Sequence, residues 1–238
     1  MIEFEPSHRD FFGRFANRAE AGRALARRLE HLRDQQPLVL ALPRGGLPVG
    51  AEIARALSAP LDILLVRKLG APFQPELAMG AIGEDEVRVL DEAIVNRLRI
   101  GRRRIDAVES RERQRIEEAG ERFRPDRPSG IVWRGRTVIV TDDGIATGAT
   151  VIAACQVARQ REVGHLVAAA PVATREAVAR LEEFADEVVV VSTPAEFMSI
   201  SQFYEDFSQV TDDEVASYLR DANRDQFHEP LEGGDPLG

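Results

Sequence analysis

The sequence predicts an α/β protein whose doubly wound, mainly parallel sheet carries helices on both faces. Two observations predict this class. Short apolar runs alternate along the chain with segments of helical periodicity, and such alternation implies right-handed crossovers and a parallel sheet. Several of the runs are continuously apolar, as expected for strands buried on both faces. The 238 residues can bury one sizeable core, or two small ones at most.

The first half of the chain opens with an amphipathic helix. Ala21, Leu25, Leu29 and Leu32 fall on one helical stripe, with arginines opposite. The elements expected here are, in order, a helix at 17–33, a buried strand at 38–42, a helix at 49–57 and a second buried strand at 61–66 that ends at Arg67 and Lys68.

The middle of the chain contains a predicted hairpin and a long helix. Residues 78–82 and 87–90 are apolar runs separated by the turn sequence GEDE, which indicates a hairpin. Asp91 is the expected N-cap of the next helix. Residues 99–124 are dense in charge and carry a thin apolar stripe, which predicts a long, largely solvated helix, followed by a loop at 125–130.

The second half returns to the alternation of strands and helices. Strands are expected at 138–140, 165–170 and 187–192, helices at 149–161 and 174–184, and a last helix from a capping box at 211–214 to about residue 222. The polar segment 223–238 is expected to form a flexible tail. No linker divides the chain, so residues 1–222 are predicted to form one domain with its core at about 38–192.

Composition and charge exclude several classes of protein. Hydrophobic residues make up 44% of the chain and charged residues 30%, as in soluble globular proteins. No apolar run approaches the roughly 20 residues that span a bilayer, and the N-terminus lacks the layout of a signal peptide, so we expect a cytoplasmic protein without a membrane partner. The net charge of −9 disfavours nonspecific binding to nucleic acid.

Metal-binding and nucleophilic motifs are not visible in the sequence. His8, His31, His165 and His228 lack metal-ligand spacing with one another or with Cys155, so a zinc site is not expected. The single cysteine excludes an internal disulfide and is expected to be a small buried residue. The lack of a Gly-x-Ser-x-Gly elbow and of a Walker lysine disfavours hydrolases and P-loop enzymes.

The most informative segment is Val138 to Thr150, which reads VIVTDDGIATGAT. Its strand delivers Asp142 and Asp143 to the carboxyl end, where a parallel sheet opens a crevice for ligands. The loop Ala146 to Thr150 has the composition of a phosphate-binding site, because its glycine permits close approach and the next helix begins with N–H groups that point at an anion.

The two acids must serve another part of the same ligand, since carboxylates repel a bare phosphate. Sugar hydroxyls or a hydrated metal ion would suit them, and a phosphorylated sugar satisfies both halves of the segment. Gly144 and Gly148 add backbone freedom, and Thr147 and Thr150 can add hydroxyl donors. The alternative is an ordinary strand-to-helix turn capped by Asp and Thr.

A second strand-loop-helix connection carries a cation. Arg44 precedes tandem glycines, which let backbone amides turn toward a ligand, and its planar fork of donors suits phosphate oxygens. Arg67 and Lys68 follow the next predicted strand, and parallel strands place their carboxyl ends at one edge, so we expect these cations to converge with the acids. The alternatives are a tight turn with a solvent-facing arginine and a surface lysine.

These motifs together resemble the type I phosphoribosyltransferases, in particular a subgroup whose substrates are uncharacterised. The resemblance is most specific at 138–150 and extends over about 38–192. It implies a small hood subdomain above the sheet, acids that hold the ribose 2- and 3-hydroxyls, and a following loop that holds the 5-phosphate. The substrate-binding residues that it implies are Arg44, Gly45, Arg67, Lys68, Asp142, Asp143, Gly144, Ala146, Thr147, Gly148, Ala149 and Thr150.

The resemblance also implies a reaction. A phosphoribosyltransferase moves the 5-phosphoribosyl group from phosphoribosyl pyrophosphate to a nitrogenous base, or runs in reverse, with Mg²⁺ and pyrophosphate. Family members bind pyrophosphate on the loop after the first strand, often through a cis peptide, and oppose it with a cation, here Lys68 first and Arg67 second. Catalytic roles are thus implied for Asp142, Asp143, Lys68 and Arg44, with Mg²⁺ held through ligand and waters near the two acids.

Two departures limit what the resemblance implies. Thr141 stands where a hydrophobic residue is common, and Ala146 stands where the 6-oxopurine enzymes commonly carry an aspartate that acts on the base. The second departure weakens hypoxanthine or guanine as acceptor. Adenine, orotate, uracil and acceptors outside nucleotide metabolism stay open, as does the oligomeric state, a homodimer included.

Most aromatic residues lie in two end segments, which suggests where the hood is. They are Phe4, Phe11, Phe12 and Phe15, then Phe197, Phe203, Tyr204 and Phe207. Residues 199–207 are the candidate for the part of the hood that stacks on the base, and the alternative is that these aromatics attach the ends of the chain to the core. A rival function is a noncatalytic sensor of phosphoribosyl pyrophosphate or nucleotide that regulates a partner.

Overall fold

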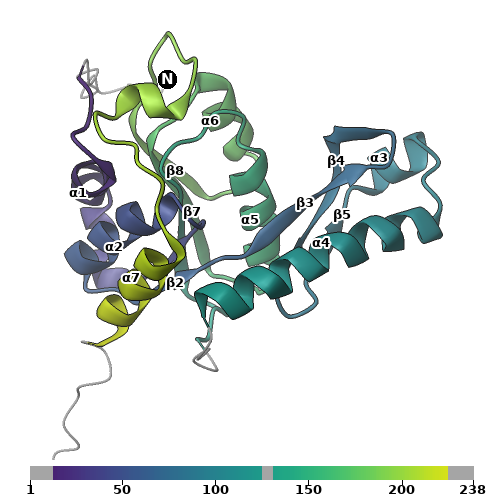
Figure 1. Ribbon diagram of the computed structural model, residues 1–238, viewed down its shortest axis with the longest axis horizontal. Coiled ribbons are helices and arrows are strands. Elements are labelled where there is room, and N and C mark those ends of the chain that lie inside the picture. The colour runs from purple at the N-terminus through teal and green to yellow at the C-terminus, as the bar shows by residue number, and fades with distance from the viewer. Residues whose placement is uncertain (1–12, 125–130, 225–238) are drawn as a thin grey trace, which may run out of the picture.

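Two sheets of unequal size organise the molecule (Figure 1). The computed structural model describes residues 13–124 and 131–224. The larger sheet has five strands, which pair in parallel, and the smaller has three antiparallel strands. The predicted α/β class with a mainly parallel sheet is therefore confirmed.

The strands and helices have the following bounds. The larger sheet contains β1 (Leu38–Ala41), β2 (Leu61–Ile63), β6 (Thr137–Thr141), β7 (His165–Val172) and β8 (Glu187–Ser192), in the order β2-β1-β6-β7-β8. The smaller sheet contains β3 (Val66–Ala71), β4 (Gln74–Gly83) and β5 (Arg88–Leu90). The helices are α1 (Arg18–Arg28), α2 (Gly46–Leu57), α3 (Glu92–Arg97), α4 (Arg102–Phe123), α5 (Ala149–Gln160), α6 (Arg175–Leu181) and α7 (Asp212–Arg224), with 3-10 turns at Glu30–Gln35 and Ile200–Phe203.

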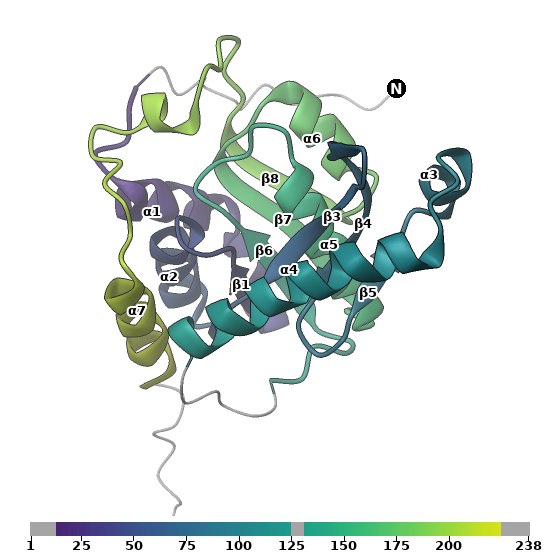
Figure 2. The ribbon, with the colours of Figure 1, turned by 45° about the vertical axis from the view of Figure 1, so that its right-hand side comes forward.

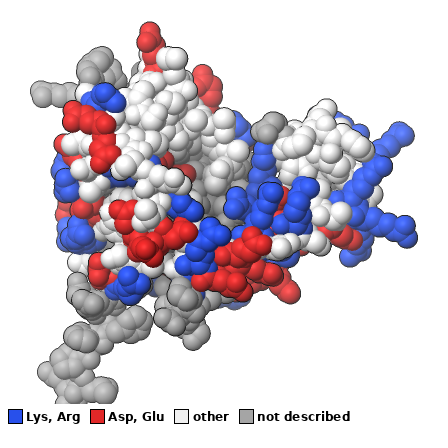
Figure 3. Space-filling view, viewed as in Figure 1, with Lys and Arg blue, Asp and Glu red and all other residues white. Residues whose placement is uncertain are grey.

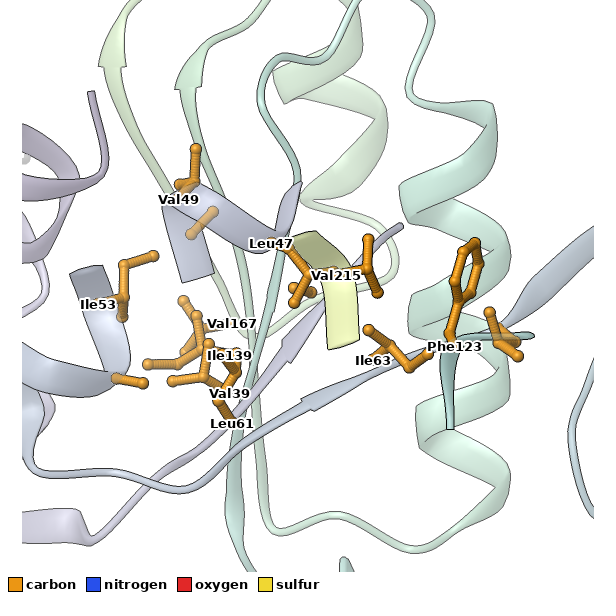
Figure 4. Close-up of a cluster of buried hydrophobic side chains, with 14 of the residues drawn as sticks. Val39, Leu47, Val49, Ile53, Leu61, Ile63, Phe123, Ile139, Val167 and Val215 are labelled. Atoms are coloured by element: carbon orange, nitrogen blue, oxygen red, sulfur yellow. The ribbon is translucent and has the colours of Figure 1, made fainter. Parts of the chain in front are cut away.

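The larger sheet separates two hydrophobic cores. Successive side chains of a strand point to opposite faces. Val39, Ile139 and Val167 therefore pack on one face with side chains of α1, α2 and α7 (Figure 4). Leu40 and Val140 pack on the other face with side chains of α5 and α6. Every residue of β1 and β6 is buried, which explains their continuous apolar sequences.

The smaller sheet and α4 extend from this body as a second layer (Figure 2). α4 has 22 residues, which corresponds to about 33 Å. It lies along β3 and β4, with Ile105 and Ile116 buried. At its C-terminal end, Phe123 joins the same hydrophobic core as Val39. The charged segment predicted as a long helix is thus confirmed, and it ends beside the larger sheet.

Arg124 connects the two sheets directly after α4. Its Nη1 donates to both carboxylate oxygens of Asp62 in β2, at 2.9 and 2.8 Å, and its Nη2 donates to Glu84 after β4. The Arg124 side chain is only 7% exposed. One buried cation therefore holds an acid from each sheet.

The predicted strand at 61–66 is wrong in its extent. β2 ends at Ile63, and the chain leaves the parallel sheet to enter β3 at Val66. Leu64 and Leu65 are buried between the two strands, so the apolar run is continuous where the chain changes sheet. Arg67 and Lys68 consequently belong to an antiparallel strand and do not end a parallel one.

The other described elements lie close to their predicted positions. β4 and β5 form the expected hairpin. Asp91 caps α3 by accepting a hydrogen bond from the Ile94 N–H at 2.9 Å, and Thr211 and Glu214 form the reciprocal capping box before α7. Cys155 is buried as expected, and burial raises its pKa to about 12. The loop at 125–130 and the tail from 225 lie outside the described residues.

Among the helices of residues 13–124 and 131–224, none combines the length and the apolar character that crossing a bilayer requires.

Replacing Arg124 by methionine should lower the free energy of unfolding by about 3 kcal/mol. The substitution removes the buried cation shared by Asp62 and Glu84, and a buried carboxylate that loses its counter-ion is strongly destabilising. Urea denaturation followed by circular dichroism measures the change.

Arg33→Met is the matched control. Arg33 pairs with Glu30 at 2.7 Å, but both side chains are about half exposed. Its loss should cost less than about 1 kcal/mol. Equal losses in the two variants would show that Arg124 does not connect the sheets energetically.

Candidate functional site

The loops after β1 and β6 diverge at the carboxyl edge of the larger sheet. β1 connects through α2 to β2 on one side, whereas β6 connects through α5 to β7 on the other side. β1 and β6 are neighbours and their chains leave in opposite directions, so this edge is the switch point of the sheet topology, where open α/β sheets bind ligands. Arg44 and Gly45 lie on one side of it, and Asp142 and Asp143 on the other.

The two loops approach so closely that only glycine fits between them. A Cβ atom on Gly45 would overlap Oδ2 of Asp143, and one on Gly46 would lie 2.8 Å from the backbone oxygen of Thr141. The tandem glycines therefore let the first loop rest directly on the acids that follow β6.

Asp143 lies in a buried ion pair. Arg18 Nε donates to its Oδ2 at 2.8 Å, and each side chain is 10% exposed. The Arg18 guanidinium carbon lies 3.8 Å from the ring centre of Phe207, and the hydroxyl of Tyr204 donates to the Asp143 carbonyl at 2.5 Å. Burial raises the pKa of Asp143, and Arg18 opposes part of that rise.

Asp142 is the more strongly perturbed acid. Burial raises its pKa well above the ordinary value, and the adjacent charge of Asp143 raises it further. The backbone N–H of Asp143 donates to Asp142 Oδ1 at 2.8 Å. The residue as a whole stays partly exposed, so a ligand can reach it. A ligand that donates hydrogen bonds, or a cation, would favour the ionised carboxylate.

The loop predicted to bind phosphate is open to solvent. Ala146, Thr147 and Thr150 are exposed. Gly148 has φ +77°, a left-handed conformation that favours glycine, and α5 begins at the next residue. The first intrahelical bond runs from Ile152 N–H to the Gly148 carbonyl at 2.8 Å, so the N–H groups of residues 149–151 have no helical acceptor, and that of Ala149 donates to the Thr147 hydroxyl at 3.4 Å. Such a helix N-terminus suits an anion.

Helix α6 supports this loop from outside. The Thr174 hydroxyl donates to the Ala146 carbonyl at 2.7 Å, and Arg180 Nη1 donates to the Thr147 carbonyl at 2.8 Å. These bonds fix two loop carbonyls against Thr174, the N-cap of α6, and against Arg180 within it. Sequence reasoning missed both residues, although Thr174 has a recognisable signal, since it also caps α6.

Two adjoining cavities extend from this loop beneath α4. The first, of about 430 Å³, has a charged lining of Arg44, Arg67, Arg115, Glu118 and Arg122, together with Thr150 of the loop. The second, of about 830 Å³, shares Arg67, Arg115 and Thr150 with the first and adds Lys68, Arg104 and Arg111. Figure 3 shows lysine and arginine side chains along α4 beside a hollow, with a patch of aspartate and glutamate side chains next to them. The acidic chain thus concentrates cations beside the loop.

The structure brings the predicted residues together in two groups. Gly45 contacts Asp143, which follows Asp142 directly, while Arg44, Arg67 and Thr150 line the first cavity. Of these two cavities, Lys68 lines the second. The peptide bond between Pro43 and Arg44 is cis.

The two aromatic end segments pack on each other beside the acids. Phe15 and Tyr204 form a parallel bridge and are fully buried, and Phe197, Phe203 and Phe207 pack around them. A Cβ atom on Gly144 would lie 2.6 Å from Ile200, so this aromatic cluster packs directly on the segment 138–150. Phe4, Phe11 and Phe12 lie outside the described residues.

Comparisons with known proteins agree on one family. A family model described as the phosphoribosyl transferase domain matches residues 15–208. Two Mycobacterium tuberculosis proteins, from strains CDC 1551 and H37Rv and both named "Putative phosphoribosyl transferase", are 50% identical to this chain over 211 residues, which make up 89% of the chain and 47% of each relative. The chain therefore spans about half the length of these curated relatives.

A solved structure with the same architecture is also found. The crystal structure of TT1426 from Thermus thermophilus matches with a TM-score of 0.81 and 42% sequence identity. The match covers 87% of this chain and 98% of that one.

Asp142→Asn should make the protein more stable at neutral pH, by about 1 kcal/mol. Asparagine keeps the acceptor for the Asp143 N–H but removes the charge. Because the folded-state pKa of Asp142 is raised, the unfolded chain loses this proton first, so the unaltered protein loses stability as pH rises above about 3.9. Urea denaturation at several pH values measures the difference in free energy of unfolding between the variant and the unaltered protein. This difference should become smaller as pH falls toward about 4. A difference that grows as pH falls would contradict the raised pKa.

Proposed function

Since the chain belongs to the phosphoribosyl transferase domain family, we propose that it transfers the 5-phosphoribosyl group from phosphoribosyl pyrophosphate to a nitrogenous base, or catalyses the reverse reaction. One observation carries the proposal. The loop 146–150, which precedes the first intrahelical bond of α5 and carries the exposed side chains of Thr147 and Thr150, lies next to Asp142 and Asp143, and the loop that carries Arg44 rests on the same acids.

Each part of the site has a role in this reaction. The loop 146–150 binds the 5-phosphate through backbone N–H groups and threonine hydroxyls. Asp142 and Asp143 accept hydrogen bonds from the ribose hydroxyls and orient the sugar. Arg44, with Gly45 beside it, binds the pyrophosphate, and Arg67 and Lys68 add positive charge.

The chemical step places growing negative charge next to these cations. A ring nitrogen of the base forms a bond with the anomeric carbon while the bond from that carbon to the pyrophosphate oxygen breaks. The pyrophosphate leaves with the electron pair, and a proton on the attacking nitrogen passes to solvent. Fixed cations stabilise the leaving group in the transition state without reorganising, which is how such a site accelerates the reaction.

Mg²⁺ belongs to the proposal because the available donors suit it. In the described parts of the chain, no group of three or more His, Cys, Asp or Glu side chains is placed to hold a metal ion. Mg²⁺ usually keeps several waters and binds substrate phosphates, so it would be held here through the ligand and waters near Asp142 and Asp143. Bound in this way, the ion would neutralise charge on the pyrophosphate.

The terminal segments are the proposed hood of a single domain formed by residues 1–222. The Phe15 N–H donates to the Phe203 carbonyl at 2.8 Å, and the Glu205 N–H donates to the Phe15 carbonyl at 2.8 Å. This pairing places residues 199–207 over Gly144, next to the proposed ribose site. We propose that the base binds against this segment. Its identity stays open, with Ala146 disfavouring the 6-oxopurines.

Asp142→Asn should weaken binding of phosphoribosyl pyrophosphate at least about tenfold, the loss expected for a hydrogen bond to a charged group. Isothermal titration calorimetry in the presence of Mg²⁺ measures the affinity. Because this variant is expected to be more stable than the unaltered protein, a loss of affinity cannot be ascribed to unfolding.

Asp106→Asn on the exposed surface of α4 is the matched control and should bind like the unaltered protein. Pyrophosphate release with a panel of bases then tests turnover. Binding without release for any base would favour the noncatalytic sensor, and a lack of binding by the unaltered protein would contradict both functions.

A further inference from the structure

The guanidinium group of Arg44 contacts a residue of α7. Arg44 Nε lies 2.9 Å from Oδ1 of Asp212, and its guanidinium carbon lies 5.9 Å from the ring centre of Phe123. Arg44 lines the cavity of about 430 Å³ that adjoins the loop 146–150.

Asp212 also reaches a second arginine of the same cavity. Its Oδ2 lies 3.7 Å from Nε of Arg122, in the last turn of α4, and Arg122 lines the cavity with Arg44. The two oxygens of one carboxylate thus face two arginines that come from the loop after β1 and from α4. Arg44 and Arg122 are 78 positions apart in the sequence (122 minus 44), so only tertiary structure brings them together.

The contact between Asp212 and Arg44 is electrostatic and leaves hydrogen-bonding capacity unused. Asp212 Oδ1 is buried and accepts no hydrogen bond from the described residues. A guanidinium is a fork of several N–H donors that suits phosphate oxygens. The ion pair therefore fixes the position of the Arg44 charge, while its donors stay available to a ligand in the cavity.

Asp212 is itself rigidly placed. It is the first residue of α7 and lies inside the capping box that Thr211 and Glu214 form. Val215 and Leu219 of the same helix are buried in the main core. Asp212 lies beyond residues 15–208, which match the family model, so this contact is contributed by a segment outside the matched domain.

We propose that Asp212 is a positioning residue for pyrophosphate: its carboxylate holds Arg44 and Arg122 on one wall of the cavity, so that both guanidinium groups converge on the leaving group. This inference rests on the proposed transferase function and adds a residue to it. Asp212 touches the arginines and not the substrate. With one carboxylate against two guanidinium groups, this wall of the cavity keeps a positive charge.

The test compares two probes that use different halves of the site. Inorganic pyrophosphate with Mg²⁺ should need the arginines, whereas ribose 5-phosphate should need the loop 146–150 and the acids. Asp212→Ala should weaken binding of pyrophosphate about fivefold, less than the tenfold or greater loss, roughly, that we expect for Arg44→Ala. Binding of ribose 5-phosphate should change less than about twofold. Calorimetric titration measures all these affinities.

Asp213→Ala is the matched control. Asp213 is the next residue of α7 and is exposed. Like Asp212, it is an acid in the first turn of the helix, where a negative charge stabilises the helix. It should bind both probes like the unaltered protein. Asp212→Asn keeps the shape of the side chain and should show the loss of Asp212→Ala, and Asp212→Glu should restore part of the affinity.

A double-mutant cycle shows whether Asp212 acts through Arg44. Added to Arg44→Ala, Asp212→Ala should weaken pyrophosphate binding further by less than about twofold, because Arg44 is no longer there to be positioned. Fully additive effects would overturn the inference. Tighter binding of pyrophosphate by Asp212→Ala would also overturn it, since Asp212 would then compete with the anion.

Failure of the inference can be told from failure of the proposed function. If the unaltered protein binds both probes and Asp212→Ala binds pyrophosphate equally well, only the positioning role is wrong. If the unaltered protein binds neither probe, the proposed function is wrong and the inference falls with it.

Discussion

The close contact between two loops at the carboxyl edge of the larger sheet is the constraint on which the site depends. Gly45 and Gly46 lie against Asp143 and Thr141 with no room for a Cβ atom. This approach is possible only because β1 and β6 are adjacent and their connections leave in opposite directions. A side chain on either glycine would push the loops apart and would separate the loop that carries Arg44 from the acids that follow β6.

The carboxylates at this edge of the sheet are partly compensated by a nearby arginine. Two adjacent carboxylates are withdrawn from water, and the pKa of each is raised. Arg18 offsets part of the desolvation cost of Asp143 through a buried ion pair, whereas it acts on Asp142 only through its charge. Asp142 is therefore the acid that a ligand would most stabilise. Around the first cavity the sign of the charge is reversed, since arginines outnumber the acids that line it. The site is therefore electrostatically divided into a half that suits hydroxyl groups or a cation and a half that suits phosphate.

Local sequence predicted the elements well where burial and periodicity coincide. β1, β6 and β7 are buried over nearly their full length, so their apolar runs are unambiguous, and the caps at Asp91 and Thr211 depend on contacts within three residues. The prediction at 61–66 was wrong because Leu64 and Leu65 are buried although the chain is changing sheets there. Hydrophobicity reports burial, and it does not report which strand becomes the hydrogen-bonding neighbour.

The sequence by itself determined the fold class, the glycine-containing loop 146–150 after β6 and the pair of acids beside it. The loop and the acids are each encoded within a short stretch of chain, and the fold class follows from a repeated local pattern. Tertiary structure alone decided the rest of the site. Arg18 reaches Asp143 across 125 positions, Arg180 and Thr174 hold the loop from another helix, and Asp212 holds Arg44. The physical reason is that an ion pair or a hydrogen bond between distant residues depends on where the packed core places two backbones, and no local pattern of residue types records that position.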